Sequence, residues 1–249
     1  MEQFKDHLER SKQGFAALEP VIEYCCSRCG LCASLCPEKA IVMEETIPRL
    51  AGNCNNCGLC YQGCPRSFFP EKKVKQRWYG TERNYLKKRI GNCVDRFTSR
   101  SLNYEIFEGG TNGGTTTALL HYLLENNFVD AVLHLDSIHK QSFICHHAKT
   151  IVSTTPEETL RGQHSKQHIT PILHDLKKLS GYQRTAVVGL SCHVEGLRKL
   201  QIIKDDPDLR QLFTALAKRA EKLIGNIEFV IGLNCFMNLK HGAIDKIYR

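Results

Sequence analysis

The chain contains Cys26-x-x-Cys29-x-x-Cys32-x-x-x-Cys36-Pro37 and repeats this motif as Cys54-x-x-Cys57-x-x-Cys60-x-x-x-Cys64-Pro65. Three thiolates at this spacing can surround one corner of an iron–sulfur cube, and in two-cluster ferredoxins the fourth ligand comes from the other motif. We therefore predict two [4Fe–4S] clusters. The first cysteine set is expected to be Cys26, Cys29, Cys32 and Cys64, and the second cysteine set Cys54, Cys57, Cys60 and Cys36.

Other uses of cysteine fit this pattern less well. A zinc ribbon needs two cysteines per knuckle, whereas each motif here has three, followed by Cys-Pro. A disulfide scaffold needs a secretory context, and the N-terminus has no signal-peptide pattern. Cys25 is expected to be a bystander. The segment 40–50 between the motifs is predicted to form a short hairpin that covers the clusters.

Composition sets the class of protein. With 249 residues and 42% apolar content, the chain can bury one core and a small satellite domain. No apolar run approaches the ~20 residues that span a bilayer, so we expect no membrane span. Thirteen cysteines without a signal peptide predict a reducing, cytoplasmic location, as in an anaerobe.

The formal charge of +8 is spread along the chain and accompanies no nucleic-acid-binding motif, so we expect no nucleic-acid partner. An acidic redox partner, such as a ferredoxin or a polyanionic coenzyme, fits this charge better.

The chain divides into three predicted regions. Residues 1–70 are expected to form the ferredoxin-like, α+β two-cluster module, which begins with a helix at 4–18 that Pro20 ends. Residues 71–106 are basic and are expected to be a linker or covering arm. Residues 107–249 alternate β-branched runs with helical patterns, which predicts an α/β domain.

Several features of the α/β region bear on binding. A glycine-rich stretch at 107–114 opens into an amphipathic helix, which is equally consistent with a phosphate site and with a structural turn. Strands are predicted at 130–135, 142–152, 185–190 and 227–233, and one long helix at 208–224. Cys192 and Cys235 follow two of these strands, at the edge where open α/β sheets bind ligands. They either share a ligand or are two small buried thiols.

The order of these motifs resembles a known family. It is carried by the two cysteine motifs and by Asn112-Gly-Gly-x-x-Thr-Ala-Leu-Leu, Val129-Asp-Ala-Val, Leu160-Arg-Gly, Gly189-Leu-Ser-Cys-His-Val-Glu-Gly-Leu-Arg-Lys and Ile231-Gly-Leu-Asn-Cys. The sequence is similar to the beta subunits of coenzyme F420 hydrogenase, F420-dependent formate dehydrogenase and F420H2 dehydrogenase.

The resemblance implies a flavoprotein in which FAD in the α/β domain exchanges a hydride with F420 and the clusters carry single electrons onward. Other subunits of a redox complex are implied as partners. It also implies a third [4Fe–4S] cluster on Cys192 and Cys235, together with a C-terminal cysteine pair. The FAD-binding residues that it implies are Asn112, Gly113, Gly114, Thr117, Arg161, Gly162 and Lys166.

The sequence departs from the family pattern at Ser191 and His193, where relatives have Pro and Gln, and in the loop 162–168. It ends at Arg249, before the C-terminal cysteine pair, so we expect a fragment or a site completed by another chain. Two alternative functions remain at this stage. One is a ferredoxin-dependent flavin reductase of another organic substrate, and the other is a non-catalytic electron-relay subunit. No side chain is assigned as a general acid, because the cofactors carry the chemistry.

Overall fold

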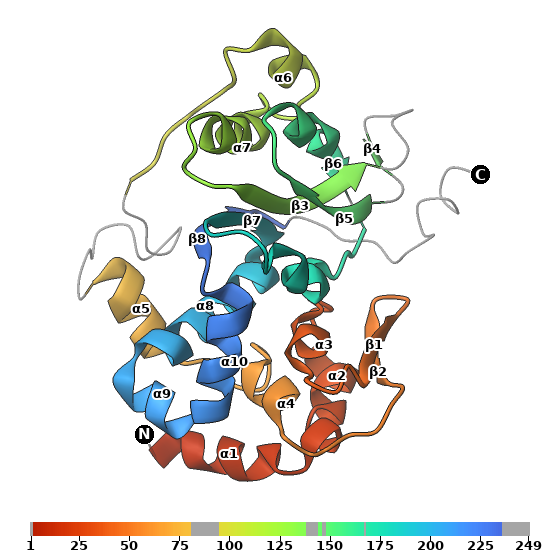
Figure 1. Cartoon of the computed structure of the whole chain (residues 1–249), viewed down its shortest axis with the longest axis vertical. Coiled ribbons are helices and arrows are strands. Elements are labelled where there is room, and N and C mark those ends of the chain that lie inside the picture. The colour runs from red at the N-terminus through yellow and green to blue at the C-terminus, as the bar shows by residue number, and fades with distance from the viewer. Residues whose placement is uncertain (1, 81–94, 138–143, 146–147, 167, 236–249) are drawn as a thin grey trace.

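The protein has a mixed α/β fold, seen in a computed structural model that describes residues 2–80, 95–137, 144–145, 148–166 and 168–235 (Figure 1). Short helices that bear the cysteine motifs, with a hairpin beside them, form one end of the molecule. A four-stranded sheet lies toward the other end, whereas the helices between residues 191 and 224 lie beside the cysteine-bearing helices (Figure 1). Within the described residues, no helix combines the length and the apolar character needed to cross a membrane.

The N-terminal end consists of short elements because glycine and proline interrupt it repeatedly. The predicted helix 4–18 is wrong as one unit: the chain turns at Gly14, which has φ +63°. Pro20 lies in the first turn of α2 and does not end a helix, since a proline is tolerated where no amide partner is needed. The predicted hairpin is confirmed by the antiparallel pairing of β1 with β2. The elements are η1 (Glu2–Phe4), α1 (Lys5–Ser11), η2 (Gly14–Ala17), α2 (Glu19–Cys25), α3 (Leu31–Leu35), β1 (Ile41–Glu44), β2 (Ile47–Leu50), α4 (Leu59–Gly63) and α5 (Glu71–Tyr79).

The larger sheet has the strand order β5-β3-β7-β8. Strand β3 pairs in parallel with β7, and β7 in parallel with β8, whereas β5 is an antiparallel edge strand. A separate pair, β4 with β6, is parallel. The strands predicted at 130–135, 185–190 and 227–233 are confirmed. The prediction of one strand at 142–152 is wrong in its described part, because β4 and β5 belong to different sheets. The strands are β3 (Ala131–Ser137), β4 (Ile144–Cys145), β5 (Ala148–Ser153), β6 (Ser165–Lys166), β7 (Thr185–Leu190) and β8 (Ile227–Leu233).

Helices cover both faces of this sheet because apolar side chains alternate along its central strands. Val132, Ala186 and Val188 pack against α7, while Leu133 and Val187 belong to the core on the opposite face. The helical elements of this half are α6 (Tyr104–Glu108), α7 (Thr115–Glu125), η3 (Glu157–Gly162), η4 (Ile172–Leu179), α8 (Ser191–Asp205), α9 (Pro207–Leu212) and α10 (Thr214–Ile224).

The predicted helix 208–224 is divided in two at Phe213. Phe213 has φ −111° and ψ 46°, and its side chain is 1% exposed. Its ring stacks on Phe68 with 5.3 Å between centroids and meets the ring of Phe4 edge-on. Burial of Phe213 among these aromatic rings therefore accompanies the break between α9 and α10.

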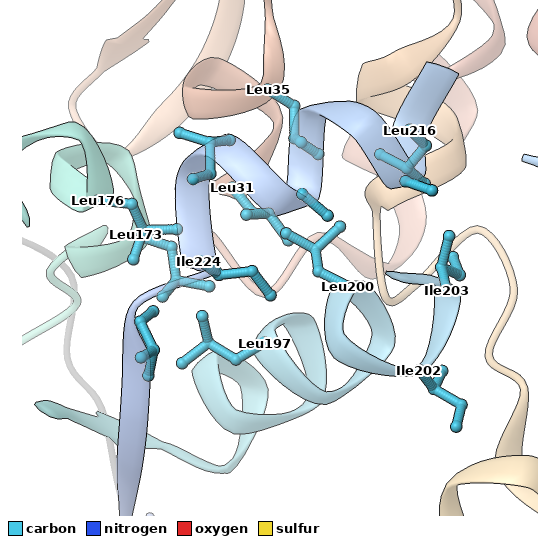
Figure 2. Packing of buried hydrophobic residues seen from close by; sticks show 14 of the residues in the cluster. Leu31, Leu35, Leu173, Leu176, Leu197, Leu200, Ile202, Ile203, Leu216 and Ile224 are labelled. Carbon is cyan, nitrogen blue, oxygen red and sulfur yellow. The ribbon is translucent and has the colours of Figure 1, made fainter. Parts of the chain in front are cut away.

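One hydrophobic core joins the cysteine-bearing helices to the sheet. Leu31 and Leu35 of α3 extend into a cluster formed by η4, α8 and α10 (Figure 2). Polar contacts strengthen this junction: the amide of Leu173 donates to Cys29 O at 3.0 Å, and Ser34 Oγ donates to Leu173 O at 2.6 Å. The loops that carry the cysteines are thus held against the face of the sheet opposite α7.

Leu200 on α8 tests the importance of this core, because its side chain is fully buried. We expect Leu200→Ala to lower the free energy of unfolding by about 2–5 kcal/mol, the usual cost of such a cavity. Urea unfolding followed by circular dichroism measures this change. Leu102→Ala is the matched control, since Leu102 is 94% exposed and its loss should cost less than about 0.5 kcal/mol. Equal effects of the two substitutions would contradict a core centred on α8.

Candidate functional site

The first cysteine set surrounds one cavity. Cys26, Cys29, Cys32 and Cys64 all line it, so the fourth thiol comes from the second motif. Cys29 and Cys32 are buried, and Cys26 and Cys64 are half-buried. The remaining wall is mostly apolar and includes Leu18, Val21, Ile22 and Leu31. Cys25 lies outside this lining and is exposed at the end of α2.

The second cysteine set surrounds another cavity, and here the fourth thiol comes from the first motif. Cys54, Cys57 and Cys60 line it together with Cys36 from the first motif. Its apolar wall includes Phe15, Ile41 and Leu50, so the hairpin contributes to this cavity. Cys57 is exposed, whereas Cys60 is buried. The second cavity therefore has one of its four cysteines at the molecular surface.

The two cysteine loops have the same backbone conformation. Arg28 and Asn56 occupy equivalent positions, and each has φ 56°. Gly30 and Gly58 follow two residues later with φ +84° and +71°, and they precede α3 and α4. A left-handed residue at both points turns each loop tightly, which brings its three cysteines to one side. A Cβ on Gly30 would lie 2.7 Å from Pro171 O, so the turn also fits closely against the chain before η4.

Burial determines the chemistry of these thiols. Desolvation raises the pKa of Cys29 to about 12, although the Leu31 amide opposes the shift. Desolvation likewise raises the pKa of Cys60 to about 12 and that of Cys32 well above its usual value. Buried thiols of this kind form thiolates when they bind a cation that compensates the charge.

This donor set fits a [4Fe–4S] cluster better than a single metal ion. Among the described residues, no three His, Cys, Asp or Glu side chains converge as they would around one ion. In an iron–sulfur cube each thiolate binds a different iron, so the sulfurs surround the group from separate sides. Four thiols around an apolar cavity match that requirement.

A larger crevice of about 530 Å³ lies beyond the carboxyl ends of the parallel strands. Leu135 of β3, Leu190 of β7 and Leu233 of β8 all contribute to its wall. The start of α7 and the segment 162–166 form the rest of its mouth. Ligands of open α/β sheets bind in this position, and the volume suits a cofactor-sized molecule.

The glycine-rich segment contributes its side chains and its backbone to this crevice. Asn112, Gly114 and Thr117 line it, at the point where α7 begins. Gly113 is not among the lining residues, but its carbonyl accepts a hydrogen bond of 2.7 Å from the amide of Ser101. The first amides of α7 have no helical acceptor, and the helix dipole favours an anion beside them.

Residues 161–166 form the opposite rim. Gly162 and Lys166 line the crevice, whereas Arg161 lies outside the lining and pairs with Asp136 at 2.7 Å. Lys166 Nζ donates to the carbonyls of Gly162, Gln163 and His164. Lys166 therefore fastens the rim loop through its backbone, and it reaches the crevice from that position.

Three buried histidines line the crevice, His134, His168 and His193, and the sequence analysis assigned a role to none of them. His134 Nε2 and Ser153 Oγ lie 2.7 Å apart, and His193 Nδ1 accepts from the amide of Leu190 at 3.0 Å. Burial lowers the pKa of the His134 imidazole and that of the His193 imidazole to about 4. The neutral ring of His193 therefore carries its proton on Nε2 and can donate to a ligand. The only signal in the sequence was the departure from the family pattern at residue 193.

Cys192 and Cys235 are close enough to influence each other electrostatically. Burial raises the pKa of Cys192, and ionised Cys235 adds to this effect. Cys235 is exposed and lines the crevice, whereas Cys192 is half-buried at the start of α8 and is not in the lining. Ionised Cys192 in turn raises the pKa of Cys29. Cys192 is thus within electrostatic reach of both Cys235 in the crevice and Cys29 in the first cysteine set.

Helix α8 connects the two sites directly. Its first turn contributes His193 to the crevice. Six residues later, Lys199 Nζ donates to Cys64 O at 2.6 Å. At 1.5 Å per residue, these two positions are roughly 9 Å apart along the helix.

Family models match the second half of the chain in sequence. The N-terminal model of the coenzyme F420 hydrogenase/dehydrogenase beta subunit matches residues 96–177, and the C-terminal model matches residues 182–249. The chain belongs to this family. The N-terminal model begins just before the glycine-rich segment and ends within η4, and the C-terminal model includes α8. The family regions therefore contain the crevice and the helix that leads from it.

Individual relatives from the F420 beta-subunit family are longer than this chain. A coenzyme F420 hydrogenase subunit beta from Methanosarcina barkeri is 26% identical over 64% of this chain and 50% of its own length. A coenzyme F420-dependent sulfite reductase from Methanocaldococcus jannaschii is 29% identical over 89% of this chain and 32% of its own length. The chain thus spans half or less of these relatives. A chain in a solved structure of the F420-reducing [NiFe] hydrogenase complex from Methanosarcina barkeri is 24% identical, with a TM-score of 0.47 over 59% of this chain and 46% of that one.

Gly14 allows a test of the second cavity, which it lines. Its φ is +63°, and a Cβ there would lie 2.9 Å from Cys54 Sγ and 2.8 Å from Asn56 Cα. We expect Gly14→Ala to reduce bound iron from about eight to about four atoms per chain after anaerobic reconstitution, because one of two cubes is lost. Iron and sulfide analysis measures this.

Gly181→Ala is the matched control, since no atom lies within 4 Å of the Cβ that it adds. Full iron content in both variants would show that the backbone at Gly14 does not shape the second cluster site.

Proposed function

We propose that the chain is the iron–sulfur flavoprotein part of an F420-linked oxidoreductase, in which FAD exchanges a hydride with F420 and [4Fe–4S] clusters carry single electrons. The observation that supports this proposal most strongly is the arrangement of the sites. Helix α8 lines the crevice with His193 and reaches the first cysteine set with Lys199. A site for a two-electron cofactor and a site for one-electron carriers therefore share one rigid element.

The proposed division of the chain follows the sequence boundaries. Residues 1–70 form the two-cluster ferredoxin-type module, 71–106 the covering arm, and 107–249 the FAD-binding domain. The two cubes are assigned to the first and second cysteine sets, in line with the two cavities that these sets line. In the arm, the centroid of the Trp78 ring of α5 lies 4.7 Å from Cζ of Arg198 on α8. This contact supports the proposal that the arm covers α8.

In the crevice, we assign FAD to the segments at the start of α7 and at 162–166. The unpaired amides of α7 favour the negatively charged pyrophosphate, and Asn112 and Thr117 offer polar side chains beside them. Lys166 adds a positive charge on the opposite rim. With FAD bound, the neutral imidazole of His193 would have its Nε2 proton available for an acceptor on the flavin, and Leu135, Leu190 and Leu233 would exclude water from it.

The environment of the protein follows from this proposal. The exposure of Cys57 supports electron exchange between the second cluster site and an acidic ferredoxin or other subunits of a redox complex. A third cluster on Cys192 and Cys235 would need further ligands, because these two thiols are only half of a [4Fe–4S] donor set. Free thiols in such number suit a reducing cytoplasm.

Filling the crevice tests the flavin assignment. Thr116 on the first turn of α7 lines the crevice, so we expect Thr116→Phe to weaken FAD binding at least about tenfold while iron content is unchanged. Leu119→Phe is the control, because Leu119 lies on the same helix and is 46% exposed. Equilibrium titration of flavin fluorescence measures both affinities. An unchanged affinity in Thr116→Phe would remove FAD from this crevice.

The activity itself is tested with the wild-type protein, purified anaerobically and reconstituted with iron, sulfide and FAD. We expect it to oxidise reduced F420 with a one-electron dye as acceptor. Bound FAD that reacts with reduced ferredoxin but not with reduced F420 would contradict the proposal in favour of a ferredoxin-dependent reductase. Full iron content without any flavin binding would contradict it in favour of an electron relay.

A further inference from the structure

Lys199 is a fully buried lysine whose amino group lies against the first cysteine set. Its side chain is 0% exposed, in the middle of α8. Nζ donates to Cys64 O at 2.6 Å and to Phe68 O at 2.7 Å, and Ser67 Oγ is 3.4 Å away. Nζ also lies 3.3 Å from the centroid of the Phe68 ring. A lysine is almost never buried in this way unless a charge or several acceptors compensate it.

The surroundings of Nζ are those of an ammonium cation. Cys64 O and Phe68 O can only accept hydrogen bonds. The Ser67 hydroxyl donates its own proton to the carbonyls of Tyr61 and Cys64, so its lone pairs face Lys199. The face of the Phe68 ring is the electron-rich side that attracts cations. A neutral amine would present a lone pair for which this site provides no donor.

The anion that balances this ammonium group is absent from the ordinary acidic side chains. Burial lowers the pKa of Lys199 well below its usual value, and within the described residues the Cys64 thiolate is the opposite charge that counters this shift. The carbonyl acceptors and the face of the Phe68 ring stabilise the ammonium form against burial. Arg66, the neighbouring cation, is already paired with Glu195. A [4Fe–4S] cluster bound by four thiolates carries negative charge, so the first cluster site is the natural counterion of Lys199.

We propose that Lys199 is a positioning residue that holds the Cys64–Phe68 turn on α8 and raises the reduction potential of the cluster bound by the first cysteine set. This inference rests on the iron–sulfur part of the proposed function. The fixed positive charge favours the reduced cluster, which holds one more electron and one more negative charge than the oxidised cluster. Lys177 acts on Cys36 of the second cysteine set only through its charge, whereas Lys199 is hydrogen-bonded to Cys64, so Lys199 is expected to act mainly on the first cluster.

The test is a redox titration of the reconstituted full chain with dithionite, followed by electron paramagnetic resonance, which requires neither F420 nor flavin. We expect Lys199→Met to shift one of the two clusters to a more negative potential. At a fixed potential, the ratio of reduced to oxidised cluster should fall on the order of tenfold for that cluster and stay constant for the other. Lys199→Arg keeps the charge and should restore the ratio.

Lys204→Met is the matched control, because Lys204 lies on the same helix and pairs with Asp205 at 2.7 Å. Unchanged ratios for both clusters in Lys199→Met, or equal shifts of both, would overturn the proposal. If Lys199→Met fails to fold, Lys199→Gln provides the same comparison, since glutamine keeps two donors for the carbonyls without the charge. The cluster potentials remain measurable even if the wild-type protein fails to oxidise reduced F420. The proposal on Lys199 and the proposed function can therefore fail independently of each other.

Discussion

Burial of Leu31 and Leu35 against η4 and α8 is the contact on which the arrangement of both sites depends. These leucines belong to α3, which starts after Cys26 and Cys29 and contains Cys32, the third thiol of the first motif. Each contributes about 1.5–3 kcal/mol by leaving water, and the hydrogen bond from the Leu173 amide to Cys29 O fixes the same junction. The position of the cysteine loops relative to the crevice therefore follows from side-chain packing, and a rigid core transmits it.

Each motif supplies the fourth cysteine of the other motif's set, and this imposes a second constraint on the fold. Cys64 completes the set that begins at Cys26, and Cys36 completes the set that begins at Cys54. Neither cavity acquires four thiols unless both loops and the hairpin between them have folded. Because metal binding to such sets contributes to folding, the stability of each cluster site is coupled to the other. The same coupling ties Lys199 to both motifs, since it holds the turn that follows Cys64.

The sequence indicated the features that short-range spacing determines. Cysteine spacing predicted two groups of four thiols that line two cavities, and β-branched runs predicted β3, β7 and β8. Features that depend on distant contacts could not be predicted in this way. The helix break at Phe213 accompanies contact with Phe4 and Phe68, far away in sequence. His134, His193 and Lys199 have no local pattern of their own, because tertiary packing alone brings them to the crevice or to Cys64.

The position of Lys199 on α8 bears on the proposed route of electrons. Helix α8 contributes His193 to the crevice and contacts the first cysteine set through the hydrogen bond from Lys199 to Cys64 O. With the proposed cofactors bound, a cation beside the first cluster would favour the step in which that cluster accepts an electron from the flavin. Exposed Cys57 would give the second cluster a contact with an outside partner. A side chain on a neighbouring helix, and not the spacing of the cysteines, would then tune the potential of the first cluster.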